Sequence, residues 1–359
     1  MSNAITLGVI GTGTIAEFHF KAFAQSKTPI AIISDINQTR AEPYLKAFGA
    51  AYAADFHQVI ATPDVNVVVC LTPSKFHYEI VKTALCDGKH VICEKTLTLS
   101  AVESLELARL AKKNGLLLFT SYMKRFFPAV RKAKELMPAL GHITSVYAWS
   151  YQGMGMDIQT GEIPESCRRI GGGDSALKQL IGGGILVAGG SHILDLLLHL
   201  VGKPQRVLGM VHRRPGLDVD FLAHAMMQLP AGGVVHLEAN WHPLKKIGYE
   251  QRGWDEGLEI SGVNGRLILN TPVWNQPEHN AAQLRFYDNQ AQTWTDFRFD
   301  IVNPFVEAET YFLSCIAAGR QDDYDPYVGY RVDHLLELTQ LSSNQGTVLD
   351  VRWEDEGES

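Results

Sequence analysis

The chain has 359 residues, of which 46% are hydrophobic, and a formal net charge of −7 at pH 7. This length exceeds what one ordinary hydrophobic core organises, so we expect two domains. The excess of acidic over basic residues disfavours nucleic acid and anionic membranes as partners, because phosphate binding depends on the density of lysine and arginine. No leader precedes the first apolar run and no stretch approaches about 18 uninterrupted apolar residues, so we expect a cytoplasmic protein without a membrane partner. The five cysteines show no CxxC spacing and are expected to be reduced packing residues.

A glycine-rich turn follows the first apolar run, residues 5–10, and the second apolar run ends at Asp35. Gly11 permits the tight turn, Gly13 lets the backbone approach a pyrophosphate, and Ala16 lets the next helix pack closely on the strand. The unpaired N–H groups at the start of that helix favour a bound phosphate. The turn follows a strand and begins a helix, and an acidic residue, Asp35, ends the next apolar run. This combination predicts a dinucleotide site.

Asp35 stands where an acid binds the ribose hydroxyls of the adenosine half. A carboxylate there repels a 2′-phosphate, and the residues that follow, Ile36 and Asn37, carry no positive charge. The sequence therefore favours NAD over NADP as the cofactor.

Short apolar runs alternate with helical periodicity up to about residue 120, and the later runs cover residues 30–34, 65–71, 90–93 and 116–120. Strands that alternate with helices form βαβ units around a parallel sheet. We expect residues 1–124 to form a Rossmann dinucleotide-binding domain of the α/β class.

The pattern changes after Pro128. Helices are expected over residues 129–137, 185–201, 305–318 and 330–343, with a polar, Gly-rich stretch before the second of them. Strand-like runs cover residues 143–151, 206–212, 221–229, 234–241, 258–261, 266–269, 284–287 and 293–299. We therefore expect residues 125–359 to form an α+β domain with a largely antiparallel open sheet, for substrate binding and oligomerisation, whose closing helices can pack back on the first domain.

Two further segments reach the carboxyl edge of the predicted parallel sheet. Thr72-Pro73 follows the third strand, and Glu94-Lys95 follows the fourth. Ligands gather at this edge, and a lysine held beside a carboxylate can orient a hydroxyl or stabilise an oxyanion. The residues expected to bind the cofactor are Gly11, Thr12, Gly13, Thr14, Ile15, Asp35, Ile36, Leu71, Thr72, Pro73, His77, Glu94 and Lys95.

The predicted helix over residues 185–201 carries a polar stripe. Ala188, His192, Asp195 and His199 are spaced so that they share one face of an otherwise apolar helix. His192 is a candidate general base, and Asp195 could accept a hydrogen bond from its other ring nitrogen. The alternative for His192 is a core histidine satisfied by hydrogen bonds. A metal site on this stripe is geometrically possible, but no Cys or His cluster completes it, so we predict no metal.

These residues together resemble the Gfo/Idh/MocA oxidoreductases, a family that includes glucose-fructose oxidoreductase and inositol dehydrogenases. The matching segments are residues 11–19, 72–77, 88–95, 125–126, 182–195 and 318–320. The resemblance implies that the motif lysine, which acts in catalysis and nicotinamide positioning, is Lys95, and that the catalytic histidine is His192. It also implies NAD(P)-dependent hydride transfer at a hydroxyl or keto carbon of a sugar, sugar acid or cyclitol.

Two positions depart from the family pattern. Thr96 replaces the usual proline, which is expected to loosen that turn, and Ala188 stands where many members carry a catalytic aspartate. The missing acid leaves open a different pattern of substrate hydroxyls, a slower enzyme, or a replacement such as Asp157 or Asp174. It also favours the alternative function, a catalytically impaired NAD-binding sensor or regulatory protein.

Aromatic faces that pack on sugar C–H groups and arginines that bind hydroxyls or a carboxylate indicate the substrate site. The residues expected there are Tyr122, Arg125, Trp149, Tyr151, Arg168, Arg169, Asp195 and Trp241. The pair Arg168-Arg169 suggests a carboxylated substrate, although a solvated charge pair explains it equally well.

The final sheet is expected to leave one face without covering helices. Its apolar content is assigned to Trp241, Trp274, Phe286, Trp294 and Phe297. Because exposed apolar patches of this size usually mark interfaces, we expect a homodimer or homotetramer through this face.

Overall fold

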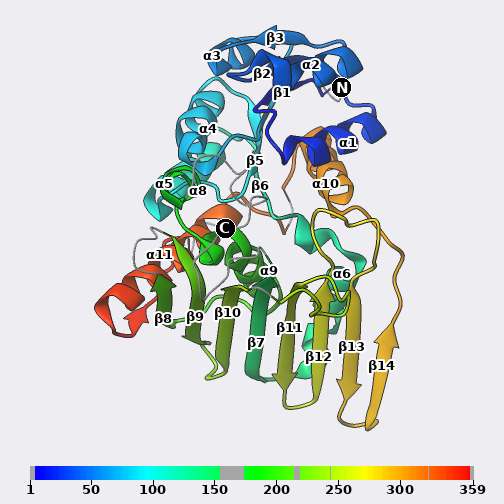
Figure 1. Cartoon of the computed structure of the whole chain (residues 1–359), viewed down its shortest axis with the longest axis vertical. Coiled ribbons are helices and arrows are strands. Elements are labelled where there is room, and N and C mark those ends of the chain that lie inside the picture. Colours follow the sequence, from blue (N-terminus) through cyan, green and yellow to red (C-terminus); the bar gives the residue numbers. More distant parts are fainter. Residues whose placement is uncertain (1–4, 154–173, 214–218, 243, 322, 356–359) are drawn as a thin grey trace. The chain divides into compact units, whose positions relative to one another are not determined.

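The computed structural model describes residues 5–153, 174–213, 219–242, 244–321 and 323–355, with the backbone alone for 174–177. The chain divides into two compact units. The first unit comprises the chain up to Met123 together with Pro304–Asp333 and Asp355. The second comprises Lys124–Asn303 and His334–Glu354 (Figure 1). The division therefore falls beside the expected boundary, and the segment Pro304–Asp333 joins the first unit.

The first unit is built on a parallel sheet of six strands in the order β3-β2-β1-β4-β5-β6. Three of the strands are buried along their whole length and a fourth, β5, along all but its first residue, as in a sheet covered on both faces. The strand order reverses between β1 and β4, which is where such sheets bind ligands. The strands are β1 Leu7–Ile10, β2 Ile30–Ser34, β3 Ala51–Ala53, β4 Val67–Cys70, β5 His90–Glu94 and β6 Leu118–Ser121.

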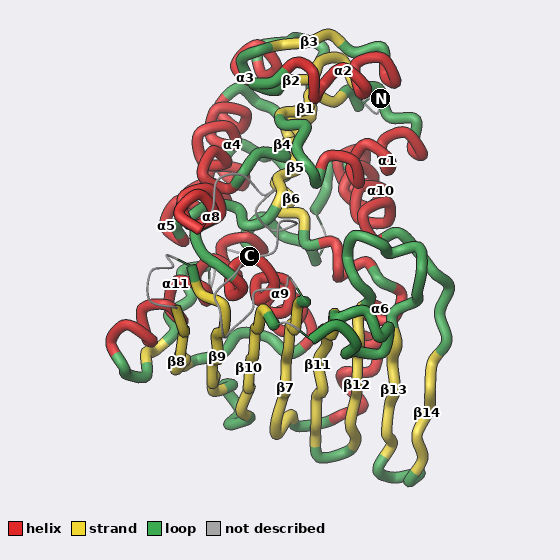
Figure 2. Tube along the Cα trace, viewed as in Figure 1, coloured by secondary structure: helices red, strands yellow, loops and turns green. Residues whose placement is uncertain are grey.

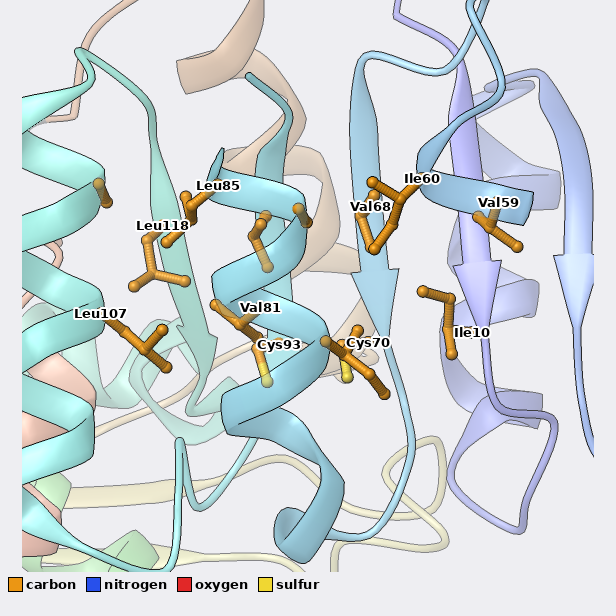
Figure 3. Close-up of a cluster of buried hydrophobic side chains, with 14 of the residues drawn as sticks. Ile10, Val59, Ile60, Val68, Cys70, Val81, Leu85, Cys93, Leu107 and Leu118 are labelled. Carbon is orange, nitrogen blue, oxygen red and sulfur yellow. The ribbon is translucent and has the colours of Figure 1, made fainter. Parts of the chain in front are cut away.

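Helices on both sides of this sheet come from the crossover connections and from the later segment of the chain. They are α1 Ala16–Ser26, α2 Gln38–Phe48, α3 Phe56–Ile60, α4 His77–Cys86, α5 Ala101–Lys113 and α10 Pro304–Ala318. A short 3-10 helix, η1 Ser74–Phe76, leads into α4. Apolar side chains of α4, such as Val81 and Leu85, pack with Val68 and Leu118 of the sheet and with Leu107 of α5 (Figure 3).

The second unit is built on a mixed sheet of nine strands in the order β14-β13-β12-β11-β7-β10-β9-β8-β15 (Figure 2). Among the described strands of this second sheet, only β7 and β10 pair in parallel, and the other pairs are antiparallel. The strands are β7 Ile143–Gln152, β8 Arg206–Arg213, β9 Asp220–Gln228, β10 Val234–Trp241, β11 Trp254–Gly262, β12 Gly265–Thr271, β13 Gln283–Asp288, β14 Thr293–Phe297 and β15 Leu349–Asp350.

Helices cover one face of this sheet. They include η2 Met123–Phe126, α6 Pro128–Leu136, η3 Met137–Leu140, η4 Leu186–Gly190, α9 Ser191–Leu200 and the later part of α11 Val328–Gln345. The helix α8 Asp174–Ile181 also belongs to the second unit. A side chain at Gly189 would collide with Ser150 and Gln152, which shows how closely η4 approaches β7. By length and composition the run Lys178–Leu200 could cross a membrane, but 72% of its apolar window is buried inside the fold. That burial is typical of a core helix.

The opposite face of the sheet carries exposed apolar side chains. Tyr147, Met210, Met226 and Trp294 are each more than a third exposed. The expectation that Trp241 and Phe286 belong to this face was wrong. Both are buried, because their positions along the strands direct them to the face that the helices cover.

Candidate functional site

The glycine turn after β1 has the shape that a dinucleotide requires. Gly11 has φ of 98°, and a Cβ there would lie 2.9 Å from the backbone of Leu71. A Cβ at Gly13 would meet no protein atom within 4 Å, so the backbone is open on that side. Ala16 is fully buried where α1 packs on the sheet. The turn therefore fits a pyrophosphate at the start of α1.

Asp35 is buried and holds the turn in place. Its Oδ2 accepts hydrogen bonds from the backbone N–H and the hydroxyl of Thr12, both at 2.7 Å. Its Oδ1 accepts the N–H of Asn37 at 2.7 Å and keeps the capacity for a further donor such as a ribose hydroxyl. Ile36 beside it is 97% exposed, and the first basic residue downstream is Arg40, on α2.

The loop after β4 is tied to the loop after β5. His77 Nε2 lies 2.6 Å from the carbonyl oxygen of Thr72, and its Nδ1 lies 2.9 Å from the carbonyl oxygen of Thr96. The hydroxyl of Thr96 donates to Ser74 Oγ at 3.2 Å. His77 is fully buried, and its two contacts join two segments that the sequence assigns to the cofactor.

Thr96 does not loosen its turn in the way that the sequence suggested. The Lys95–Thr96 peptide bond is cis, and Thr96 is buried with both its carbonyl oxygen and its hydroxyl bonded. The turn is therefore fixed by hydrogen bonds that a proline could not all supply, since proline has no hydroxyl.

His19 of α1 lies between two carboxylates. Its Nε2 lies 2.9 Å from Glu94 Oε1 and its Nδ1 lies 2.7 Å from Glu309 Oε1, on α10. Burial lowers the pKa of His19, but the hydrogen bonds and charges of Glu309 and Glu94 outweigh it and raise that pKa to about 9. Glu94 Oε2 accepts the backbone N–H of Lys95 at 3.0 Å. Sequence reasoning missed this cluster because Glu309 is 290 residues from His19.

Cys70, Cys93 and His77 bring their ligand atoms within 4.8 Å of one another beneath these loops. Both ring nitrogens of His77 lie within hydrogen-bond distance of carbonyl oxygens, so a metal ion bound there would have to displace one of these contacts. Burial raises the pKa of Cys70, but the hydrogen bond to the Cys93 thiol, the charge of His77 and the bonds to Thr72 outweigh it and lower that pKa. The cluster is a hydrogen-bonded support for the two loops.

The helix that carries His192 starts as a π-helix, η4, and continues as the α-helix α9. Continuous α-helix was the expectation, and π segments frequently occur at functional sites. From Gly183 to Leu200, only Ala188, His192, Leu198 and His199 are not buried. The predicted stripe is thus the accessible part of an otherwise buried helix, apart from Asp195.

Asp195 does not play the part that the sequence suggested, because its carboxylate is paired with Arg125. The Nε of Arg125 lies 3.0 and 2.9 Å from the two carboxylate oxygens, and its Nη2 lies 2.6 Å from Oδ1. Burial raises the pKa of Asp195 and Arg125 opposes that shift. Burial, with the charges of Arg125 and Lys134, lowers the pKa of His199 to about 3, so it is neutral at pH 7.

A second buried network lies on the helix-covered face of the sheet and was missed from the sequence. Glu256 is fully buried and pairs with Lys124. It also accepts hydrogen bonds from Trp254 Nε1 at 2.7 Å and Gln152 Nε2 at 3.1 Å, and one from the hydroxyl of Ser150. No spacing rule joins these residues, which come from η2, β7 and β11.

The other residues assigned to the substrate are spread over the fold. Trp149 and Tyr151 lie on the face of the sheet opposite to η4 and α9, where Tyr151 bonds Glu238 at 2.9 Å. Tyr122 is fully buried in the first unit, and its N–H donates to the hydroxyl of Tyr324. Arg168, Arg169 and Asp157 lie outside the described residues, as does the side chain of Asp174.

Ala188 borders an apolar cluster. It packs with Phe221 against a cluster formed by Ile185, Val219, Ala239 and Trp241. The buried acid Asp220, between Val219 and Phe221, accepts the backbone N–H groups of Gly184 and Leu186, both at 2.8 Å, at the start of the same helix.

Comparison with known families matches both parts of the chain. The model of an oxidoreductase family with an NAD-binding Rossmann fold matches residues 5–122, and the Gfo/Idh/MocA C-terminal domain matches residues 130–268. The chain belongs to the Gfo/Idh/MocA family of oxidoreductases. Two predictions, the family and a Rossmann domain followed by a mostly antiparallel sheet, are thereby confirmed.

Several proteins similar to this chain are named dehydrogenases. Levoglucosan dehydrogenase of Pseudarthrobacter phenanthrenivorans is 26% identical over 323 residues, covering 80% of this chain and 77% of the relative. D-xylose 1-dehydrogenase (NADP(+)) 2 of Haloferax volcanii is 22% identical over 349 residues, covering 96% and 99%. A solved structure of levoglucosan dehydrogenase with NADH and levoglucosan has a TM-score of 0.81 at 21% identity, covering 97% of this chain and 100% of that one. The prediction of an NAD(P)-dependent oxidoreductase is confirmed.

Proposed function

We propose that this protein is an NAD-dependent dehydrogenase that oxidises a CH–OH group of a sugar, sugar acid or cyclitol. The observation that carries the proposal is the meeting of three segments at one edge of the parallel sheet. The glycine turn, the loop at Thr72 and the loop at Lys95 follow β1, β4 and β5, which are neighbours in the sheet. Hydrogen bonds of His77 link the last two of these loops.

The order of the strands orients the cofactor. Asp35 follows β2, so the adenosine half belongs on that side of β1, and the nicotinamide half belongs over β4 and β5. Bound NAD supplies the hydride acceptor. Lys95 at the end of β5 is then the group that stabilises negative charge on the substrate oxygen. His192, on the accessible stripe of its helix, takes the hydroxyl proton as general base.

NAD rather than NADP is supported by Asp35. A 2′-phosphate would place further negative charge beside this buried carboxylate, and the exposed side chain of Ile36 offers no counter-charge. The relatives include enzymes named for each cofactor, so relatedness alone does not decide the preference.

The surroundings of Ala188 support a substrate with fewer hydroxyl groups at this position than a full cyclitol has. An aspartate would bind a hydroxyl there, whereas the cluster with Phe221 and Trp241 favours C–H groups or a ring ether. Anhydro and deoxy sugars have this chemistry. We therefore place them ahead of inositols among the substrates.

We also propose that the protein self-associates through the exposed face of the second sheet. Tyr147, Met210, Met226 and Trp294 give that face the apolar area that interfaces carry. A cytoplasmic dimer or tetramer is the proposed form of the enzyme.

The test is a turnover assay with NAD and a panel of anhydro sugars, deoxy sugars, sugar acids and inositols, read at the absorbance band of reduced nicotinamide. NADH formation with an anhydro or deoxy sugar is the expected result. Tight NADH binding with no turnover of any panel member in either direction would contradict the enzyme and favour the sensor alternative.

A further inference from the structure

We propose that His19 is a positioning residue for Lys95: it holds the Glu94 carboxylate, and that carboxylate holds the backbone of Lys95. The inference rests on the proposed function and on the nicotinamide-positioning role that the family resemblance implies for Lys95. His19 belongs to α1 and has no place among the residues assigned to the cofactor.

The first step is the contact between His19 and Glu94. Both side chains are buried, and the ring Nε2 lies 2.9 Å from Glu94 Oε1. A hydrogen bond between charged groups is shorter and stronger than a neutral one, and burial protects it from water. The carboxylate of Glu94 therefore has one fixed position at the end of β5.

The second step is the contact between Glu94 and Lys95. The other carboxylate oxygen of Glu94 accepts the backbone N–H of Lys95 at 3.0 Å. On the far side of Lys95, the carbonyl oxygen of Thr96 is bonded to His77 at 2.9 Å. Buried histidines thus hold the residues that flank Lys95, and His19 acts on the Glu94 side.

The ring of His19 contacts a second carboxylate, that of Glu309, through its other nitrogen. With carboxylates facing both ring nitrogens, a doubly protonated imidazolium lets both nitrogens donate. Glu309 supplies the second acceptor, and its neighbour in α10, Phe305, packs edge-on to the ring with centroids 5.6 Å apart. The groups that face His19 are Glu94 from β5 and Glu309 from α10, with Phe305 and Phe23 as its aromatic neighbours.

The experiment compares two ligands of the full-length protein, NADH and ADP-ribose, which lacks nicotinamide. In His19→Gln, loss of a charge-assisted bond should weaken NADH about tenfold and leave ADP-ribose within about twofold of wild type. His19→Leu, which removes every donor, should weaken NADH more. Phe305→Leu is the matched control, because it loosens the packing of α10 on His19 without removing the bond to Glu94.

Equal weakening of both ligands in His19→Gln would mean that His19 only supports the fold, and unchanged binding of both would mean that it does not act on Lys95. Either result overturns the inference. A second variant, Lys95→Met, distinguishes failure of the inference about His19 from failure of the proposed function. If Lys95→Met binds NADH and turns over substrate like wild type, the role of Lys95 itself is wrong. If it loses NADH selectively while His19→Gln does not, only the present inference fails.

Discussion

Single residues at the carboxyl edge of the parallel sheet do their work through hydrogen bonds within the first unit. Asp35 accepts three bonds, which fix the glycine turn and the start of the next loop. His19 and His77 hold the residues on either side of Lys95. The sequence indicated Asp35 and His77, since both lie in recognisable motifs, but it could not indicate the partner of His19 on α10.

Asp35→Ala should change the choice of cofactor. Removing the carboxylate removes its repulsion of a 2′-phosphate and its bond to ribose, so the ratio of NAD to NADP affinity should fall at least about tenfold. Fluorescence titration with NADH and NADPH measures the ratio. Asp64→Asn, an exposed acid outside the turn, is the control. An unchanged ratio in Asp35→Ala would show that this carboxylate does not select the cofactor.

The stability of the protein should depend on the charge of His19. The pKa of His19 in the folded protein, about 9, lies above the ordinary histidine value of 6.5, so the stabilisation is complete below pH 6.5 and disappears as pH rises through 9. The loss should be on the order of 3 kcal/mol. Urea unfolding of wild type and His19→Gln at pH 6 and about pH 10 measures it. Equal loss of stability in the two proteins would rule out His19 as the cause.

Among the elements, long periodic helices and strands were predictable and their partners were not. The strand-like runs after Pro128 became β7 to β14, but the parallel pairing of β7 with β10 depends on a crossover that no local pattern encodes. β3 and β15 have three and two residues, too few for a period to show. The π-helical start of the His192 helix escaped notice because apolar spacing alone does not distinguish π from α over five residues.

The η2 and α9 elements are joined by the buried pair of Arg125 and Asp195. Arg125→Met should destabilise the protein by about 3 to 5 kcal/mol, because it leaves a buried carboxylate without its partner. Replacing both partners, as in Arg125→Met with Asp195→Leu, should recover most of that loss. Urea unfolding provides the comparison. A double variant no more stable than Arg125→Met would show that the uncompensated charge is not the cause.

At the scale of the whole molecule, the proposed self-association uses the face of the nine-stranded sheet that is exposed in the single chain. We expect light scattering at micromolar concentration to give at least twice the mass of one chain. Met226→Lys puts a charge on the exposed sheet face and should shift the mass towards the monomer, because a buried unpaired charge opposes association. Leu341→Lys, an exposed apolar position on α11, should not. A monomeric wild type would contradict this part of the proposal.

The central claim is that Lys95 serves hydride transfer with a sugar or polyol. The measurement is kcat for Lys95→Met and wild type at saturating NAD with the panel member that wild type oxidises, together with thermal unfolding of both. We predict a fall in kcat of at least about a hundredfold with an unchanged unfolding temperature. A folded Lys95→Met variant with the kcat of wild type would contradict the account.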